Sequence, residues 1–273
     1  MRTAKAAQPG TGAALAQEFA AQAGNPDFML SLARGLRVIE SFEGHHEGRS
    51  IVEISQSTGL SRAAIRRILL TLELLGYVER SRQVYRLKTQ VLRLGFSFLS
   101  SSSVVEAARP VLERISEQLH ESSSMSMLDG EQIVYVARAA ASRIMAAGLS
   151  VGSRLPAYCT SMGRVLLAAL PDERLDAYLR DLKPRAYTPK TITRIPQLKK
   201  AILQVRKDGY AIVDEELEAG LRSIAVAVST RNSQVLAAIN VGTHVSRVDR
   251  GTLIRRCLPV LQEGARTLRN LLF

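Results

Sequence analysis

The residues best able to do chemistry in this sequence are three closely spaced arginines in "GLSRAAIRRILLTLELLGYVER", which runs from Gly59 to Arg80. Arg62, Arg66 and Arg67 belong to a strong helical pattern. The one acid in the same helix, Glu73, lies six or more positions beyond Arg66 and Arg67. Side chains on a helix pair at spacings of three or four residues, so Glu73 cannot neutralise these arginines. Positive charge without an acidic partner in the helix indicates a partner outside the helix.

The basic charge of the chain is concentrated around these arginines. The 273 residues include 37 Lys and Arg against 25 Asp and Glu, a net charge of +12. Residues 61–95 have a net charge of +6, whereas residues 1–60 have a net charge of −1. A clustered positive patch attracts a polyanion through counterion release, and nucleic acid is the commonest such partner. A solvated basic surface is the alternative that charge alone leaves open.

Apolar residues at helical spacing predict the buried side of the helix that carries the arginines. The core stripe expected there is Ile65, Ile68, Leu69, Leu72 and Leu75. An earlier helix, in "LSLARGLRVIESF", is expected to place Leu32, Leu36, Val38 and Ile39 on one face. Both helices therefore have one side that can pack into a small core.

Turn signals divide this region into elements. A short helix over residues 51–57 and a turn at Gly59 precede the arginine helix, Ser61 is placed to cap it, and Gly76 ends it. Residues 77–87 then predict two short strands around a basic tip. Helix, tight turn, amphipathic helix and basic hairpin form the order of a winged helix-turn-helix.

A winged helix-turn-helix places its second helix in the major groove of DNA and its hairpin, the wing, beside the phosphate backbone. The helix residues expected to contact bases or phosphates are Ser61, Arg62, Arg66 and Arg67. The wing residues expected to contact the backbone are Arg80, Arg82 and Arg86.

The rest of the chain alternates between strand-like and helical patterns, which describes an α+β domain of antiparallel strands with helices packed on them. Strands are predicted at 124–128, 132–138, 143–149, 210–213, 224–229 and 235–241, and helices at 161–170, 172–182, 196–208 and 249–271. The expected organisation is a disordered tail over 1–27, a winged helix-turn-helix over 28–88, a linker helix over 89–103 and a second domain over 104–273.

No catalytic or metal-binding constellation stands out in the sequence. The histidines have no HExxH spacing, no GxSxG elbow occurs, and Cys159 and Cys257 lie far apart. No long apolar run predicts a membrane span, so we expect a cytoplasmic protein without cofactor or metal. The acidic cluster Glu215-Glu216-Glu218 is expected to be a solvated loop rather than a general acid or base.

Two further arginines border apolar strands. Arg138 ends "IVYVAR" and, by strict alternation, projects to the same side as Val134 and Val136. Arg222 directly precedes "SIAVAV". The planar guanidinium of an arginine beside an apolar cavity can hold a small carboxylate by two hydrogen bonds. The alternative is an arginine at the end of a strand that extends into water.

Hydroxyl groups gather before the helix predicted at 161–170. Tyr158, Thr160 and Ser161 stand in "LPAYCTSMGR", where a helix N-terminus would favour an anion. The alternative role for Thr160 or Ser161 is to cap that helix.

In these segments the sequence resembles the IclR family of bacterial transcriptional regulators, and within it the branch that controls aromatic-acid catabolism through the β-ketoadipate pathway. The resemblance runs from about Phe28 to Leu271 and rests on blocks such as "SLARGLRVIESF", "GLSRAAIRRILLTLELLGYV" and "LDGEQIVYVAR". The resemblance to the branch rests on "RLPAYCTSMGRVLLAALP", "GLRSIAVAV" and "NVGTHVSRV".

The resemblance implies a winged helix-turn-helix, a linker helix for dimerisation and a GAF-like α/β effector-binding domain. It also implies that dimers, or dimers of dimers, bind a palindromic DNA operator and respond to a small aromatic or dicarboxylic acid. Arg138 would anchor the effector carboxylate. The residues implied around the effector are Tyr158, Thr160, Ser161, Met162, Arg222 and Asn240.

The sequence therefore predicts a ligand-responsive, DNA-binding transcriptional regulator that is not an enzyme. One alternative is an enzyme acting on a small organic acid, with an accessory helical domain. The absence of a positioned nucleophile, metal set or cofactor motif disfavours it. A nonspecific DNA binder is a further alternative, which the large second domain outside the basic cluster disfavours.

Overall fold

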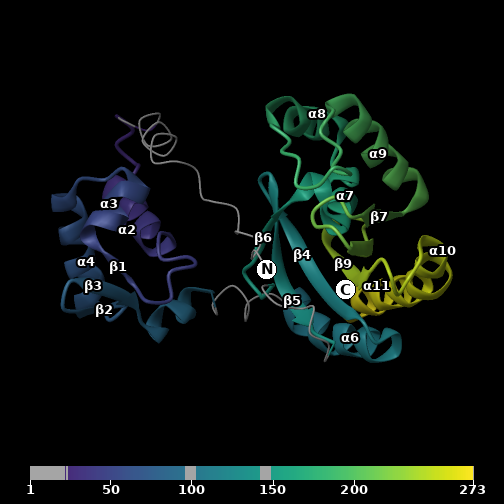
Figure 1. The fold of residues 1–273 in the computed structure, drawn as a ribbon, viewed down its shortest axis with the longest axis horizontal. Helices are drawn as coiled ribbons and strands as arrows, with labels where there is room; N and C mark the ends of the chain where they lie inside the picture. The colour runs from purple at the N-terminus through teal and green to yellow at the C-terminus, as the bar shows by residue number, and fades with distance from the viewer. Residues whose placement is uncertain (1–21, 23, 96–102, 142–148, 273) are drawn as a thin grey trace. The chain divides into compact units, whose positions relative to one another are not determined.

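A computed structural model describes residues 22, 24–95, 103–141 and 149–272 of the chain (Figure 1). The chain separates into two compact units, residues 1–98 and 99–273. This division falls inside the range 89–103 that the sequence assigned to the linker. Most of the tail expected over 1–27 lies outside the described residues.

The first unit is a winged helix-turn-helix, as the sequence predicted. Its helices are α2 (Leu30–Glu40), α3 (Ile51–Thr58) and α4 (Arg62–Leu74). Its antiparallel sheet has the order β1-β3-β2, from β1 (Arg49–Ser50), β2 (Val78–Ser81) and β3 (Val84–Leu87). Strand β1 was not predicted, because two residues are too few to form an alternating pattern.

Caps and turns fix the ends of the two central helices. Ser50 and Glu53 form a capping box at the start of α3, and Gly59 ends that helix with a φ of 71°. The Ser61 hydroxyl accepts a hydrogen bond from the Ala64 amide, so its predicted role as the cap of α4 is confirmed. Gly76, with a φ of 78°, lies just after the end of α4.

The core of the first unit is smaller than its apolar patterns predicted. Val38, Ile54, Ile65 and Leu69 are fully buried. Leu75, which was expected in the core stripe of α4, is exposed, and so are Leu32 and Leu36 on the apolar face of α2. Helix α2 instead uses its C-terminal end, around Val38, for the core.

The described part of the linker begins as helix. A 3-10 turn, η1 (Thr89–Val91), leads into helical residues 92–95. The remainder up to residue 102 lies outside the described residues, and helix α6 begins at Ser103.

The second unit is built on an antiparallel sheet with the order β6-β5-β4-β9-β8-β7. The strands are β4 (Ser122–Asp129), β5 (Gln132–Ala139), β6 (Arg154–Pro156), β7 (Tyr210–Asp214), β8 (Leu221–Ser229) and β9 (Val235–His244). The short strand β6 was not predicted. The strand expected over 143–149 falls almost wholly outside the described residues.

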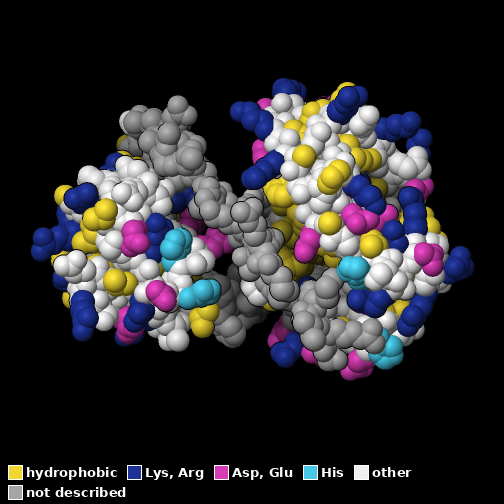
Figure 2. All heavy atoms as spheres, in the orientation of Figure 1, with side chains coloured by type: hydrophobic (Ala, Val, Ile, Leu, Met, Phe, Trp, Pro, Cys, Tyr) yellow, Lys and Arg dark blue, Asp and Glu magenta, His cyan; other side chains and the backbone are white. Residues whose placement is uncertain are grey.

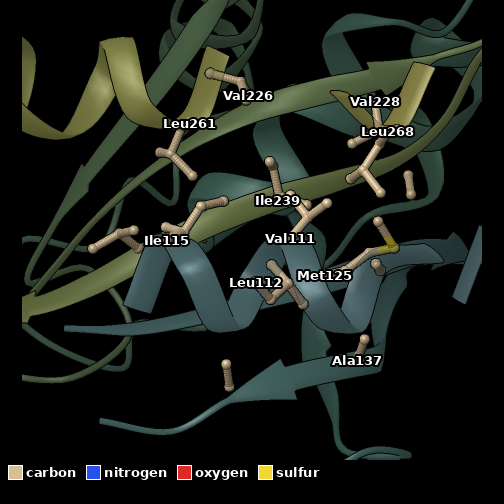
Figure 3. Packing of buried hydrophobic residues seen from close by; sticks show 14 of the residues in the cluster. Val111, Leu112, Ile115, Met125, Ala137, Val226, Val228, Ile239, Leu261 and Leu268 are labelled. Carbon is tan, nitrogen blue, oxygen red and sulfur yellow. The ribbon is translucent and has the colours of Figure 1, made fainter. Parts of the chain in front are cut away.

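Helices cover both faces of this sheet. On one face lie α6 (Ser103–Leu119) and a C-terminal helical segment made of α10 (Arg250–Thr252), η4 (Leu253–Cys257) and α11 (Leu258–Leu272). Figure 3 shows apolar side chains of α6 and α11 meeting those of β4, β8 and β9. On the other face lie η3 (Ala157–Cys159), α7 (Ser161–Ala168), α8 (Asp172–Asp181) and α9 (Ile195–Asp208).

A β-bulge interrupts the alternation of strand β5. Met125 of β4 pairs with Ala137, whereas the next residue, Ser126, pairs with Tyr135, so Val136 is an extra residue. Tyr135 packs in the layer beneath α7, whereas Val136 and Ala137 both pack beneath α6 and α11. The residues after the bulge therefore face the opposite way from what strict alternation predicts.

Candidate DNA interface and effector site

The basic face of α4 is exposed and has no acidic partner. Arg62, Arg66 and Arg67 are all exposed. None of their side chains forms an ion pair or hydrogen bond with another described residue. Ile65, Leu69 and Leu72 are buried in the core, which fixes the orientation of the helix and leaves the three arginines exposed. The predicted DNA-binding residues of this helix, with Ser61 at its start, are thus accessible.

The wing is a tight hairpin, and contacts with neighbouring groups hold some of the arginines near its basic tip. Arg82 lies in the turn with a φ of 56°, and its carbonyl accepts a hydrogen bond from Arg80 Nε at 3.0 Å. The Arg80 guanidinium also lies 5.8 Å from the centre of the Tyr85 ring. Arg86 Nε donates to the Glu47 carbonyl at 3.0 Å. Hydrogen bonds to backbone carbonyls leave the charge of Arg80 and Arg86 unneutralised.

Space-filling Figure 2 shows Lys and Arg side chains distributed around α4 and the β2–β3 hairpin of the first unit. Acidic and histidine side chains of this unit are also visible in the same view. The arrangement is that of a DNA-reading helix flanked by a second basic element.

In the second unit, the bulge turns Arg138 toward α7. The sequence predicted Arg138 on the same side as Val136, and this was wrong because Val136 is the extra residue of the bulge. Arg138 Nη1 donates to Ser124 Oγ at 3.2 Å. The neighbours of Ser124 along β4, Ser123 and Met125, face α6, so Ser124 and Arg138 lie on the α7 side of the sheet.

Arg138 differs from the other arginines that are removed from water in this unit. The described residues of the unit include three buried or half-buried arginines, Arg138, Arg164 and Arg222. Arg164 pairs with Glu216 at 2.6 Å, and Arg222 binds Asp214 through two hydrogen bonds of 2.9 Å. Arg138 has no acidic partner among the described residues. A half-buried guanidinium without an acidic partner has hydrogen-bond donors whose geometry matches a carboxylate.

The first turn of α7 supplies polar groups to the same face. Thr160 caps the helix by accepting a hydrogen bond from the Gly163 amide. This is the capping role that the sequence offered as the alternative to anion binding. Ser161 follows it, is 1% exposed, and its hydroxyl has no hydrogen-bond partner among the described residues. Met162 Sδ accepts a hydrogen bond from Ser126 Oγ at 3.2 Å, which ties this turn to β4.

Gly163 allows the turn before α7 to pack tightly on the helix. A Cβ at this position would lie 2.1 Å from the Ala157 carbonyl oxygen. The η3 turn therefore rests directly against α7, and this contact fixes where Thr160 and Ser161 lie.

Asn240 completes a polar row across three strands. Arg138 pairs in register with Ser124, and Ser124 pairs in register with Asn240 on β9. The Asn240 side chain is 8% exposed, and its Oδ1 has no hydrogen-bond partner among the described residues. The structure thus brings together Arg138, Asn240 and the first turn of α7.

Two of the sequence-predicted effector residues are not brought into this group. Arg222 lies on the opposite face of the sheet, where it binds Asp214 and donates to the Val248 carbonyl at 2.8 Å. The Tyr158 hydroxyl donates to the Arg185 carbonyl at 2.6 Å and accepts from the Arg185 amide at 2.9 Å. Both side chains are engaged in structural contacts.

Sequence reasoning missed the buried ion pair beneath α7. Glu216 is 6% exposed and binds Arg164, so the expectation that the whole 215–218 cluster is a solvated loop was wrong. Its backbone carbonyl also accepts a hydrogen bond from Thr191 Oγ1 at 2.5 Å. An arginine within the short helix "SMGRVLLA", which is otherwise small and apolar, was the one available signal. Ser124 was also missed, since one serine in a strand carries no pattern.

Burial suppresses ionisation around the site. It raises the pKa of Tyr135 to about 12, although the positive charge of Arg138 opposes this shift. It also raises the pKa of Cys159 to about 12, with a contribution from Glu216 and an opposing one from Arg164. Tyrosine and cysteine are neutral at pH 7 even at their ordinary pKa values, and burial keeps these two groups uncharged at higher pH as well.

The described residues include no cluster of three His, Cys, Asp or Glu side chains able to hold a metal ion. Within the same part of the chain, no helix has both the length and the apolar character needed to cross a membrane.

A helix-turn-helix unit joined to a separate α+β unit, each with arginines lacking acidic partners, defines the class of ligand-responsive DNA-binding regulators. Family comparison agrees. The IclR helix-turn-helix domain matches residues 31–82, and the C-terminal domain of bacterial transcriptional regulator IclR matches residues 96–270. The chain belongs to the IclR family of bacterial transcriptional regulators, which are not enzymes.

Three similar proteins place the chain more closely. It is 48% identical over 274 residues to the Pca regulon regulatory protein of Pseudomonas putida, covering 100% of this chain and 94% of the relative. A solved candidate transcriptional regulator from Rhodococcus sp. RHA1 is 48% identical, with a TM-score of 0.80 over 90% of this chain and 98% of the other. A doubly mutated inducer-binding domain of PobR from Acinetobacter, in complex with 3-hydroxybenzoic acid, is 32% identical, with a TM-score of 0.59 over 63% of this chain and 100% of the other. The expected family and branch are confirmed.

Proposed function

We propose that this protein regulates genes of aromatic-acid catabolism by binding an operator through its first unit and a small organic acid through its second. The observation that carries the proposal is Arg138, a half-buried guanidinium whose one hydrogen bond among the described residues goes to Ser124. The relative from Pseudomonas putida and the PobR complex with an aromatic acid support the same assignment.

On the DNA, Ser61, Arg62, Arg66 and Arg67 of α4 contact bases or phosphates in the major groove, and Arg80, Arg82 and Arg86 of the wing contact the backbone. The exposed, acid-free side of α4 supports this role. The proposed domain limits remain 28–88 for the DNA-binding domain, 89–103 for the linker and 104–273 for the effector domain.

In the second unit, Arg138 anchors the effector carboxylate and the first turn of α7 lies beside it. Thr160, Ser161, Met162 and Asn240 are kept as contact residues. Tyr158 and Arg222 are not proposed to contact the effector. The Tyr158 hydroxyl already binds Arg185, and the Arg222 guanidinium already binds Asp214 and Val248. Effector binding shifts the protein between states that space the DNA-reading helices differently.

The test is a fluorescence binding assay on the DNA upstream of the protein's own gene, with a salt titration and then protocatechuate, 4-hydroxybenzoate and β-ketoadipate in turn. We expect a steep salt slope, a preference over random DNA and a change in affinity with one acid. Arg138→Ala is expected to weaken binding of that acid by about tenfold to a hundredfold, since a hydrogen bond to a charged group contributes about 1.5–3 kcal/mol. Arg180→Ala, an exposed arginine of α8, is the matched control. Equal affinity for random DNA and no effect of any acid would refute the proposal.

The same function requires two copies of the chain, because a palindromic operator presents two equivalent half-sites. Leu32 and Leu36 on α2 support a dimer, since they are 57% and 48% exposed and lie one turn apart. Replacing both with glutamate is expected to shift the protein toward the monomer in analytical ultracentrifugation. Val151→Glu, which changes an apolar residue 46% exposed in the second unit, is the control. An unchanged sedimentation coefficient for the double variant would exclude this surface from the dimer.

A further inference from the structure

The effector face contains an unsatisfied polar group distant from the carboxylate anchor. Asn240 lies two strands away from Arg138 in the same register row, about 10 Å at the usual strand spacing. Its Oδ1 is buried without a partner among the described residues. A buried amide without hydrogen bonds costs free energy, so native structures satisfy such groups with protein, water or ligand.

The first turn of α7 lies close to this row. Met162 is hydrogen-bonded to Ser126, and Ser126 is two residues from Ser124 on the same face of β4. Two residues along a strand span about 7 Å. Ser161, the residue before Met162, has the second buried polar atom of this face that lacks a partner among the described residues. Two polar groups without partners among the described residues, Asn240 on β9 and Ser161 on α7, therefore lie on the same side of the sheet.

The environment of Asn240 is uncharged. Its neighbours in the row and beside it on this face are serine and alanine: Ser124, Ala225 and Ala238. Arg164, the buried cation of α7, is held by Glu216 and the Tyr158 carbonyl. A second carboxylate at Asn240 would be buried without a cation, which is costly. The atom without a partner, Oδ1, accepts hydrogen bonds, so it matches a hydroxyl group, which donates; a ketone oxygen only accepts and leaves Oδ1 unpaired.

We infer that Asn240, assisted by Ser161, is a specificity-determining residue that binds an uncharged oxygen carried by the effector away from its carboxylate. This inference rests on the proposed function. Arg138 gives affinity for carboxylates in general. Asn240 then selects acids that also bear a hydroxyl group, because an analogue without that hydroxyl leaves Oδ1 unpaired.

The experiment measures calorimetric affinity of the full-length protein for two ligand pairs that differ in one oxygen: 4-hydroxybenzoate with benzoate, and β-ketoadipate with adipate. We expect the wild type to prefer 4-hydroxybenzoate over benzoate by about tenfold or more, and to prefer β-ketoadipate over adipate by less, because a keto oxygen cannot donate to Oδ1. Asn240→Leu keeps the approximate side-chain volume and removes the amide. It is expected to bring that ratio close to one, mainly by weakening the oxygen-bearing acid.

Ser161→Ala is a second variant for the case that Asn240→Leu does not fold, since it removes one hydroxyl only. It is expected to reduce the same affinity ratio. Asn232→Leu, in the exposed turn between β8 and β9, is the matched control and should keep the wild-type ratio. An unchanged ratio in both Asn240→Leu and Ser161→Ala, or an equal loss for both members of a pair, would overturn the inference while leaving the regulator proposal intact. A wild type that binds none of the four acids would overturn the inference, and the regulator proposal would then be decided by the DNA-binding assay with protocatechuate.

Discussion

The two units use arginine in opposite surroundings. On α4, Arg62, Arg66 and Arg67 are exposed side by side, and their combined charge has no acid to oppose it. On the effector face, one arginine is half-buried and has a serine as its neighbour. Water screens exposed charges, so the α4 group suits a long polyanion that meets several of them at once. A hydrogen bond between charged groups is stronger in a buried site than in water, so Arg138 suits one small anion of defined shape.

The contrast extends within the second unit. Arg164 is a buried residue of α7, the helix beside the proposed effector site, but it is paired with Glu216. Whether a buried arginine can bind an external anion thus depends on whether the protein already provides an acid beside it. Three experiments can break or sharpen this comparison.

The largest effect is expected from Arg164→Ala, which leaves Glu216 buried without its partner. Removing one member of a buried ion pair costs about 3–5 kcal/mol in the free energy of unfolding, which urea denaturation measures. Lys199→Ala is the control, because its pair with Asp176 is exposed and such pairs contribute about 0–1 kcal/mol. Equal losses for the two variants would show that burial does not set the strength of these pairs.

A smaller effect is expected when an acid is placed among the free arginines of α4. Ala63→Glu stands three and four residues before Arg66 and Arg67, where it can pair with both. We expect the affinity for operator DNA to fall by about 1–3 kcal/mol and the salt slope to become shallower, because the acid neutralises part of the DNA-binding charge. Ala63→Gln is the control of similar size. An equal loss for Ala63→Gln would mean that bulk, and not charge, is responsible.

The smallest effect concerns a group that burial keeps neutral. Because the pKa of Cys159 is raised to about 12 in the folded chain, its thiol should stay unreactive toward a thiol reagent at pH 8 and react after denaturation. The unfolded chain releases this proton first, so the contribution of Cys159 to stability decreases as the pH rises from about 9 toward about 12. Cys257 is also buried, so Cys257→Ser isolates the signal of Cys159. Rapid reaction of the native Cys257→Ser protein would contradict this burial.

Local signals were sufficient for most of the fold. Ser61, Gly59 and Gly76 act through the backbone beside them, and the structure confirms each cap or turn. The strands β4, β5, β8 and β9 follow their apolar patterns. Burial in the first unit was harder to predict, because Leu32 and Leu36 have the same spacing as core residues but this chain leaves them exposed.

The candidate site was less predictable, because it depends on contacts between distant segments. The position of Arg138 beside an apolar strand predicted its role, but its direction depends on a β-bulge that no sequence pattern predicts. Arg222 has a similar sequence context, and the structure pairs it with Asp214 on the other face. The pairing of Arg164 with Glu216 joins residues 52 positions apart, which no local pattern can reveal.

The bulge at Val136 acts as a phase shift in the pattern of strand β5. Because of the extra residue, Tyr135 before it and Arg138 after it both face the layer beneath α7, although they are three residues apart. Deleting Val136 would leave a regular strand in which Ala137 still pairs with Met125 and Arg138 with Ser124, so the guanidinium would keep its direction. A regular strand of the present length would instead turn Arg138 into the apolar layer beneath α6 and α11, so the bulge, and not the identity of Val136, sets the direction of this arginine.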